Sequence, residues 1–392
     1  TVQIGGKTYP VEELAVRMFE GEGESLIKNV TAITLPEGLK RLEKNSLYSE
    51  VVSATEVTIP ASVEYVGTYF LRGKTLKKIT FKGSPVLADN SVGSDYKLIH
   101  FMSQTPPAVG KYSFQSAHLM VVAPDIASIP VYRTTLSGHW GVEKGYELSV
   151  YGGLKEADNV YYSAMEDGNA CAIYFDGTQT SVALSKTIQI DGAARALAKI
   201  QRGLFYYKKI TEVIVPETVK TIGGNAFYKC SALTSLQLPS EVEEIGDYAF
   251  YECSALAIDV TLPGLKTLGK GAFQISGIKS LNLTGAPLAT IPEFAFGQCF
   301  NLASITLNEG LSIIGSSAFT GAVVTELTIP STVTDIYTVG IWSKIKKLIS
   351  KATTPPTLRN SRQLNCPLFV PNGCVTAYRQ ADQWVASTSV IA

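Results

Sequence analysis

The sequence has few charged residues and little that would attract a charged partner. Asp, Glu, Lys and Arg make up 17% of the 392 residues, below the usual quarter. The 34 basic and 34 acidic residues cancel, so we expect no nucleic acid and no polybasic membrane contact. No apolar run reaches 18 residues, so we expect no membrane span. Hydrophobic residues reach 45%, which is enough for a large core and argues against wholesale disorder.

Motifs for catalysis, metals and cofactors are also lacking. The sequence has no G-x-G-x-x-G, no phosphate-binding loop, no G-x-S-x-G, and no C-x-x-C or H-x-x-x-H pair. The three histidines, His100, His118 and His139, all fall in one part of the first half, and the regular second half has none. A catalytic triad assembles in space, so sequence alone does not exclude one. We predict no catalytic residue, no metal ligand, no cofactor and no enzyme.

What the sequence does contain is a repeat of 23 residues. Cys230, Cys253, Ser276, Cys299 and Ala322 fall 23 residues apart each time. An Ala-Phe pair precedes each of them, and a short alternating apolar run such as "LTSLQLP" follows. The composite is L-x-x-L-x-[LI]-P-x-x-[LV]-x-x-[IL]-G-x-x-A-F-x-x-C-x-x. Self-similarity at a fixed period of this length predicts a solenoid.

Each part of the repeat has a predicted structural role. The L-x-L alternation has period two, which is typical of a short strand with one face inward. Pro ends the strand because it cannot donate to a ladder. The Gly is expected to make a tight corner at positive φ. Ala-Phe brings apolar groups to the opposite wall, and Cys, Ser or Ala fills a tight inner corner. Stacked coils would then share one core and one parallel sheet.

The repeats of "AFYKCSALTSLQLP" resemble the BspA-type leucine-rich repeat family of bacterial cell-surface proteins. Five copies of Ala-Phe-x-x-[Cys/Ser/Ala] in register carry the resemblance. It implies an α/β leucine-rich repeat solenoid that is strand-dominated with short helical turns. It also implies a cell-surface or secreted protein, exported from a bacterium, that mediates adhesion to an extracellular protein or glycan without enzymatic activity.

A longer duplication predicts two tandem arrays. Residues 103–140 match 351–384 in the order Thr-Pro-Pro, apolar strand, Tyr and Trp. In the family this module resembles the closing segment of an array, and an open solenoid end needs a cover. We expect "NGCVTAYRQADQW" to form a short helix in the second copy. Each array would then be closed by a Thr-Pro-Pro/Tyr/Trp cap module.

The first half keeps the strand and Pro positions of the repeat but loses the Cys, so the first array is degenerate. The predicted domains are residues 1–148 as the first array with its cap at about 100–148, residues 149–190 as a strand-rich hairpin module that opens the second array, residues 191–347 as the regular array, and residues 348–392 as the C-terminal cap.

The six cysteines invite a disulfide interpretation in an exported chain. Stacked equivalents have parallel Cα–Cβ vectors, so their Cβ atoms would lie ~4.8 Å apart rather than the ~3.8 Å a disulfide prefers. We therefore predict that Cys230, Cys253 and Cys299 are buried free thiols. Cys366 and Cys374 are the better pair, but the strand between them would have to turn back sharply, and their state stays open.

The outward residues of the strands form the candidate binding face. They are mostly short and polar: Glu212, Ser235, Gln237, Asp259, Thr261, Ser280, Asn282, Ser304, Thr306, Glu326, Thr328 and Lys347. Such a face suits a broad protein or glycan partner, and the alternative is a solvated face with β-favouring Thr. It lacks the Tyr, Trp and Arg clusters of hot spots, so no tight partner is expected there. Tyrosine gathers instead at 205–209 and 159–165, where sugar stacking is an option.

Three functional hypotheses follow from the sequence. The first is a surface or secreted binding protein, the second is a structural spacer that holds another domain away from the cell, and the third and most remote is a glycan-active module. The chain begins at Thr1 without a signal peptide, and we infer that it was cut at its front. A signal peptide or lipid anchor would then lie upstream.

Overall fold

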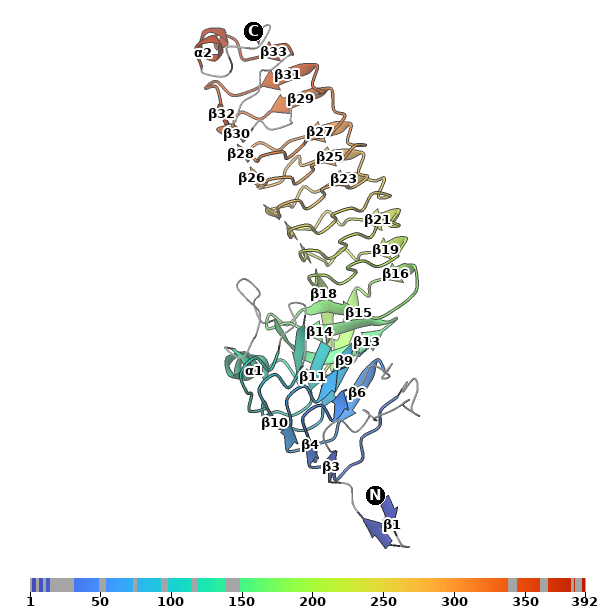
Figure 1. The fold of residues 1–392 in the computed structure, drawn as a ribbon. Helices are drawn as coiled ribbons and strands as arrows, with labels where there is room; N and C mark the ends of the chain where they lie inside the picture. The colour runs from blue at the N-terminus through green and yellow to red at the C-terminus, as the bar shows by residue number, and fades with distance from the viewer. Residues whose placement is uncertain are drawn as a thin grey trace, which may run out of the picture. The chain divides into compact units, whose positions relative to one another are not determined.

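The computed structural model divides the chain into two compact units, and each is described by itself (Figure 1). The structure describes residues 2–4, 7–9, 12–14, 32–48, 54–72, 76–92, 98–114, 119–137, 149–337, 344–359, 366–381, 384 and 390–391. Unit 1 comprises residues 1–156, 161–169 and 189–195, and unit 2 comprises residues 157–160, 170–188 and 196–392. The predicted domain boundaries at 148, 190 and 347 stay predictions.

Unit 1 is built mostly from short strands that pair in parallel, while its first two strands pair antiparallel. In chain order the elements are β1 (Val2–Ile4), β2 (Lys7–Tyr9), β3 (Glu13–Leu14), β4 (Arg41–Leu42), β5 (Leu47–Tyr48), β6 (Glu56–Ile59), β7 (Tyr65–Val66), β8 (Leu71–Arg72), β9 (Lys78–Phe81), β10 (Val86–Leu87), β11 (Leu98–Phe101), β12 (Met120–Ala123), α1 (Ile129–Leu136), β13 (Val150–Ala157) and β14 (Val160–Ala164). Strands β6, β9, β11, β12 and β13 pair in parallel and in that order. Strands β3, β4, β7 and β10 form a second parallel sheet. Buried Val, Leu, Ile and Phe side chains from both sheets make one core.

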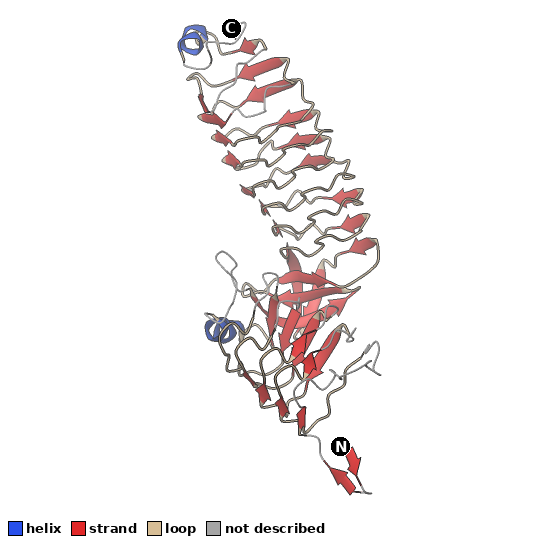
Figure 2. Cartoon of the chain, in the orientation of Figure 1, coloured by secondary structure: helices blue, strands red, loops and turns tan. Residues whose placement is uncertain are grey.

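Unit 2 repeats the same two-walled turn more regularly. Its elements are β15 (Ala170–Phe175), β16 (Ser181–Ala183), β17 (Thr187–Ile190), β18 (Ala193–Ile200), β19 (Glu212–Ile214), β20 (Thr221–Ile222), β21 (Ser235–Gln237), β22 (Glu244–Ile245), β23 (Asp259–Thr261), β24 (Thr267–Leu268), β25 (Ser280–Asn282), β26 (Thr290–Ile291), β27 (Ser304–Thr306), β28 (Ile313–Ile314), β29 (Glu326–Ile329), β30 (Asp335–Tyr337), β31 (Lys347–Ser350), β32 (Thr357–Arg359), β33 (Leu368–Phe369), α2 (Val375–Gln380) and β34 (Val390–Ile391). Figure 2 shows these short strands stacked turn upon turn and joined by loops, with α2 near the C-terminus. The prediction of a strand-dominated solenoid is confirmed.

The L-x-L strands stack into one wall of unit 2. They pair in parallel as β16-β19-β21, β23-β25-β27 and β29-β31-β33-β34. The [IL]-G positions form a second wall of two- and three-residue strands, paired as β20-β22-β24 and β26-β28-β30-β32. The sequence analysis expected only a corner there, because a two-residue strand is too short to show a period.

The Phe of each Ala-Phe pair lines the inside of the coil, as predicted. The five are Phe227, Phe250, Phe273, Phe296 and Phe319, which are 0–2% exposed. Phe205, which follows Leu204 rather than Ala, adds one more buried ring before them. Successive rings lie 4.8–5.5 Å apart between centroids, and from Phe227 onward they are stacked. Backbone hydrogen bonds tie the same wall together, since the Phe227 N–H donates to the Ala249 carbonyl and the Phe250 N–H to the Ala272 carbonyl. This ladder of rings is the continuous core of the regular turns.

The prediction that the repeat's Gly sits at positive φ is wrong. Neither Gly246 nor Gly269 has a positive φ, and Gly is required because the neighbouring turn comes too close. A Cβ on Gly246 would lie 2.4 Å from the Gly224 N, and one on Gly269 would lie 2.2 Å from the Asp247 N. Left-handed backbone falls in the Ala-Phe loop instead, for example at Asn225 with φ 55°.

The buried cysteines are free thiols, as predicted, and each has a hydrogen-bond acceptor. Cys230, Cys253 and Cys299 are fully buried, and all six cysteines of the chain are unbridged. The Sγ of Cys253 donates to the Phe227 carbonyl at 3.1 Å, and the other two thiols make the equivalent bond at 3.0 Å. Burial raises the pKa of Cys230 to about 12 and that of Cys299 to about 11. These thiols therefore stay protonated and chemically quiet.

The two Thr-Pro-Pro modules fold alike where the structure describes both. The Tyr132 hydroxyl of α1 donates to the Ser103 carbonyl at 2.7 Å, and the Tyr378 hydroxyl of α2 donates to the Ala352 carbonyl at 2.9 Å. The helix expected in "NGCVTAYRQADQW" is α2, and Trp384 is fully buried beyond it. The first module's Trp140, with His118 and His139, lies outside the described residues. The capping role of both modules stays a prediction.

Candidate binding surfaces

The strand face of unit 2 carries two columns of outward side chains in register. Glu212 pairs with Ser235, and Asp259, Ser280 and Ser304 align on three successive strands. The central residue of each strand faces the other way, because alternate residues of a strand point to opposite sides. Leu236 and Val260 are buried, and Ile305 of β27 is partly buried. The columns therefore follow from the L-x-L alternation alone.

None of the twelve predicted face residues is buried. Seven are exposed, namely Ser235, Gln237, Asp259, Thr261, Ser304, Thr306 and Glu326, and five are partly exposed, namely Glu212, Ser280, Asn282, Thr328 and Lys347. The structure thus brings them onto one wall in parallel strands. Ile214, which is 54% exposed on the same strand as Glu212, also lies on this wall and was not among the predicted residues. A role in binding stays a prediction.

The charges on this face are partly paired between neighbouring turns. The Ser280 hydroxyl donates to the Asp259 carboxylate at 2.6 Å, and the Ser181 hydroxyl donates to Glu212 at 2.8 Å. The Lys347 ammonium lies 3.4 Å from Glu326. Exposed pairs of this kind contribute little stability, so the face keeps its polar groups available to a partner at small cost.

Unit 1 has a groove on the equivalent strand face. Its volume is about 500 Å³, and it is lined by Ala32, Ile33, Thr34, Leu35, Glu37, Thr55, Glu56, Val57, Thr58, Pro60, Lys78, Thr80 and Lys82. The lining comes from residues 32–37 and from β6 and β9, which pair in parallel. The sequence analysis did not extend the outward columns to this array, although "TEVTIP" shows the same alternation.

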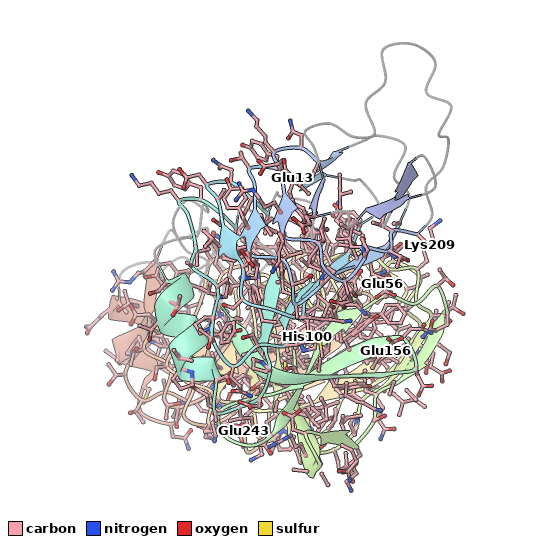
Figure 3. All side chains as sticks on the ribbon, turned by 90° about the horizontal axis from the view of Figure 1, so that it is seen from below. Glu13, Glu56, His100, Glu156, Lys209 and Glu243 are labelled. Carbon is pink, nitrogen blue, oxygen red and sulfur yellow. The ribbon has the colours of Figure 1, made fainter. Side chains whose placement is uncertain are left out.

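A partly buried cation, Lys78, and a neutral histidine, His100, lie on the sheet of this groove. The Lys78 ammonium contacts the Glu56 carboxylate at 2.5 Å and lies 5.2 Å from the Tyr161 ring centroid. His100 lies on β11, opposite Thr80 of the neighbouring strand β9, which also carries Lys78. Glu56 lies on β6 of the same sheet (Figure 3). Burial, with the nearby Lys78 charge, lowers the pKa of His100 to about 4. His100 is therefore neutral at physiological pH.

Five tyrosines form a cluster on the surface of unit 2. Tyr206, Tyr207, Tyr228, Tyr248 and Tyr251 come from three successive turns, and Tyr206 and Tyr207 are 41% and 56% exposed. The Tyr206 and Tyr228 rings stack at 5.0 Å, and the Tyr228 and Tyr251 rings stack at 4.8 Å. The sequence showed the concentration of Tyr at 205–209 but not that the rings of three turns come together.

In the part of the chain that the structure describes, no three His, Cys, Asp or Glu side chains gather in a group that could hold a metal ion. None of the helices in the described ranges is long and apolar enough to cross a membrane.

Comparisons with solved structures find several proteins described as leucine-rich and one described as a vaccine antigen. One is a leucine rich cell surface protein from Faecalibacterium prausnitzii, 25% identical, with a TM-score of 0.46, where the match covers 57% of this chain and 65% of that one. Another is the pneumococcal vaccine antigen PcpA, 15% identical, with a TM-score of 0.34, where the match covers 100% of this chain and 86% of that one. The match thus spans less than two thirds of the F. prausnitzii protein. No curated protein matches the chain.

A family model identifies the repeat itself. The model, described as a BspA type leucine rich repeat region, matches residues 25–120, 198–286 and 233–347 with six copies. The matched ranges cover more than half of the 392 residues and include turns of both units. The chain therefore belongs to the BspA-type leucine-rich repeat family, as the resemblance in its sequence predicted.

Proposed function

We propose that the protein is a non-enzymatic binding protein, displayed on the surface of a bacterium or secreted, that adheres to an extracellular protein or glycan. The observation that carries the proposal is the strand face of unit 2. Polar side chains stand there in register on parallel strands, and all twelve are at least partly exposed. Repeat proteins use extended surfaces of this kind for recognition.

The chemistry of the face favours a broad and moderate contact. Its residues are mostly Ser, Thr, Asn and Gln with a few acids, and it lacks the aromatic and Arg anchors of hot spots. Affinity would come from many hydrogen bonds across several turns. Display of many copies on a cell would strengthen such binding through avidity.

The test places one large cation in the middle of the face. Ser304→Arg and Thr261→Arg put a long charged side chain at exposed positions of β27 and β23. Thr290→Arg is the matched control, because Thr290 is equally exposed on the second wall of the same unit. We expect saturable binding in an array of matrix proteins and glycans, lost in the first two variants and kept in the control. Equal binding by all three variants would refute the assignment to this face, and no binding by the intact chain would favour a spacer.

A further inference from the structure

The tyrosine cluster of unit 2 is not explained by the packing of the repeat. Tyr206, Tyr228 and Tyr251 each follow a Phe of the buried ladder, and the same slot holds Gln274 in the next turn. The solenoid therefore does not need an aromatic side chain at this position. Three successive turns carry one nevertheless, and their rings stack on the outside of the coil.

The rings are held in place before any ligand arrives. Tyr207 packs against Tyr206 at 4.7 Å, and Tyr248 packs edge-on against Tyr251 at 5.8 Å between centroids. Tyr248 also lies close over the next turn, where a Cβ on Gly271 would come within 2.4 Å of its ring. Burial against these neighbours raises the pKa of Tyr206, Tyr228 and Tyr251, so their hydroxyls stay protonated donors. Prearranged side chains lose little entropy on binding.

The charges inside the cluster compensate one another. The Lys229 ammonium lies 5.5 Å from the Tyr207 ring centroid and 3.4 Å from the Glu252 carboxylate. A second pair borders the cluster at Tyr248, where the Lys270 ammonium lies 2.7 Å from the Glu293 carboxylate. Each of these two cations thus has an anion in contact. A neutral ligand suits such a surface better than an anionic glycan or a nucleic acid does.

The size of the cluster argues against a protein partner. With about 200 Å² for a whole tyrosine, the five rings at their observed exposure offer roughly 250–400 Å². A stable protein interface needs about 800 Å² on each side. Three turns at ~4.8 Å spacing extend over about 10 Å, which suits a short chain of sugar rings.

We propose that this cluster is a binding site for a neutral oligosaccharide. The apolar face of a pyranose would pack on the exposed rings of Tyr206 and Tyr207. The tyrosine hydroxyls, with Lys229 and Glu252 at the edge, would bond the sugar hydroxyls. The site is separate from the strand face, so either proposal can fail without the other.

The experiment uses substitutions that the repeat itself contains. The double variant Tyr206→Gln/Tyr228→Gln places in two turns the Gln that a later turn has at the same repeat position, Gln274. Tyr207→Lys places there the Lys that the next turn has at the same repeat position, Lys229. Tyr112→Gln is the matched control, because Tyr112 is 58% exposed in unit 1. Each variant is applied to an array of neutral oligosaccharides with heparin and sialylated glycans alongside, and any neutral glycan bound is then titrated by calorimetry. Unchanged melting temperatures establish that the variants are folded.

We expect saturable binding of at least one neutral oligosaccharide, weakened tenfold or more in the Tyr206/Tyr228 variant and in Tyr207→Lys. The Tyr112→Gln variant and the second-wall variant Thr290→Arg should bind it as the unaltered protein does. The proposal is overturned if no neutral glycan binds, if only heparin or sialylated glycans bind, or if the tyrosine variants bind undiminished. Should the double variant unfold, the single variant Tyr207→Lys decides.

Discussion

Truncation of one ring in the Phe ladder should destabilise unit 2 strongly and locally. Phe250 is fully buried, and its ring stacks on Phe227 at 4.9 Å and on Phe273 at 4.8 Å. Phe250→Ala removes a large core side chain, which costs ~3–5 kcal/mol. Each of the two lost aromatic pairs contributes ~0.5–1.5 kcal/mol beyond its buried area. The expected cost of Phe250→Ala is therefore near the upper end, at ~5 kcal/mol.

The assay is denaturant unfolding followed by circular dichroism, with native-state hydrogen exchange to locate the effect. Phe300→Ala is the control, because Phe300 is 63% exposed in the same unit and should change stability by less than about 0.5 kcal/mol. In a solenoid each turn contacts only its neighbours. Exchange should therefore accelerate most in the turns that hold Phe227, Phe250 and Phe273.

Two results would refute this reasoning. If Phe250→Ala were no more destabilising than Phe300→Ala, the Phe rings would not form the core. If exchange accelerated evenly over unit 2, the turns would not be coupled mainly to their neighbours.

The remaining predictions concern pH, thiols and the close approach of turns. The folded pKa of His100, about 4, is below its unfolded value of about 6.5, so its stabilisation is present above pH 6.5 and is lost as the pH falls toward 4. The loss of folding free energy is at most about 3 kcal/mol. His100→Thr should therefore reduce the fall in the melting temperature of unit 1 between pH 7 and pH 4.5, and a fall as large as in the unaltered protein would contradict this. A thiol reagent should modify the partly exposed Cys374 quickly and the five buried cysteines only on unfolding, which mass spectrometry checks; a second fast thiol would contradict it. Cys253→Ser should lower the free energy of unfolding by less than about 1.5 kcal/mol in denaturant melts, because the serine hydroxyl can donate to the Phe227 carbonyl as the thiol does; a larger loss would show that this hydrogen bond does not offset the burial of the hydroxyl. Gly246→Ala should lower the melting temperature although φ there is not positive, because its Cβ would lie 2.4 Å from the Gly224 N of the preceding turn; an unchanged melting temperature would mean that the turns can separate.

The repeat made the core and one wall of the turn predictable. Period-two alternation identifies the strands, and the regular return of Phe250 and Cys253 in their slots identifies buried positions, because both signals are local. The second wall was missed, since Ile245-Gly246 is too short for any period. The reason for Gly246 was also missed, because its constraint is a backbone 22 residues away rather than its own φ.

The candidate surfaces were predictable only in part. The outward columns follow from the alternation, so all twelve residues could be named in advance. The groove of unit 1 needs residues from three stretches of chain and their side-chain volumes, which no local pattern contains. The tyrosine cluster depends on stacking between turns, so the sequence indicated its composition but not its packing.

The most direct test of function is the binding of the intact chain to an array of extracellular-matrix proteins and glycans, compared with its strand-face variants. We predict saturable binding of a partner that does not depend on Tyr207, and we expect Ser304→Arg and Thr261→Arg to abolish it and Thr290→Arg to leave it intact. If the binding of every such partner survives both strand-face variants, or if the folded chain binds no such partner, the proposal that the strand face of unit 2 mediates adhesion is contradicted.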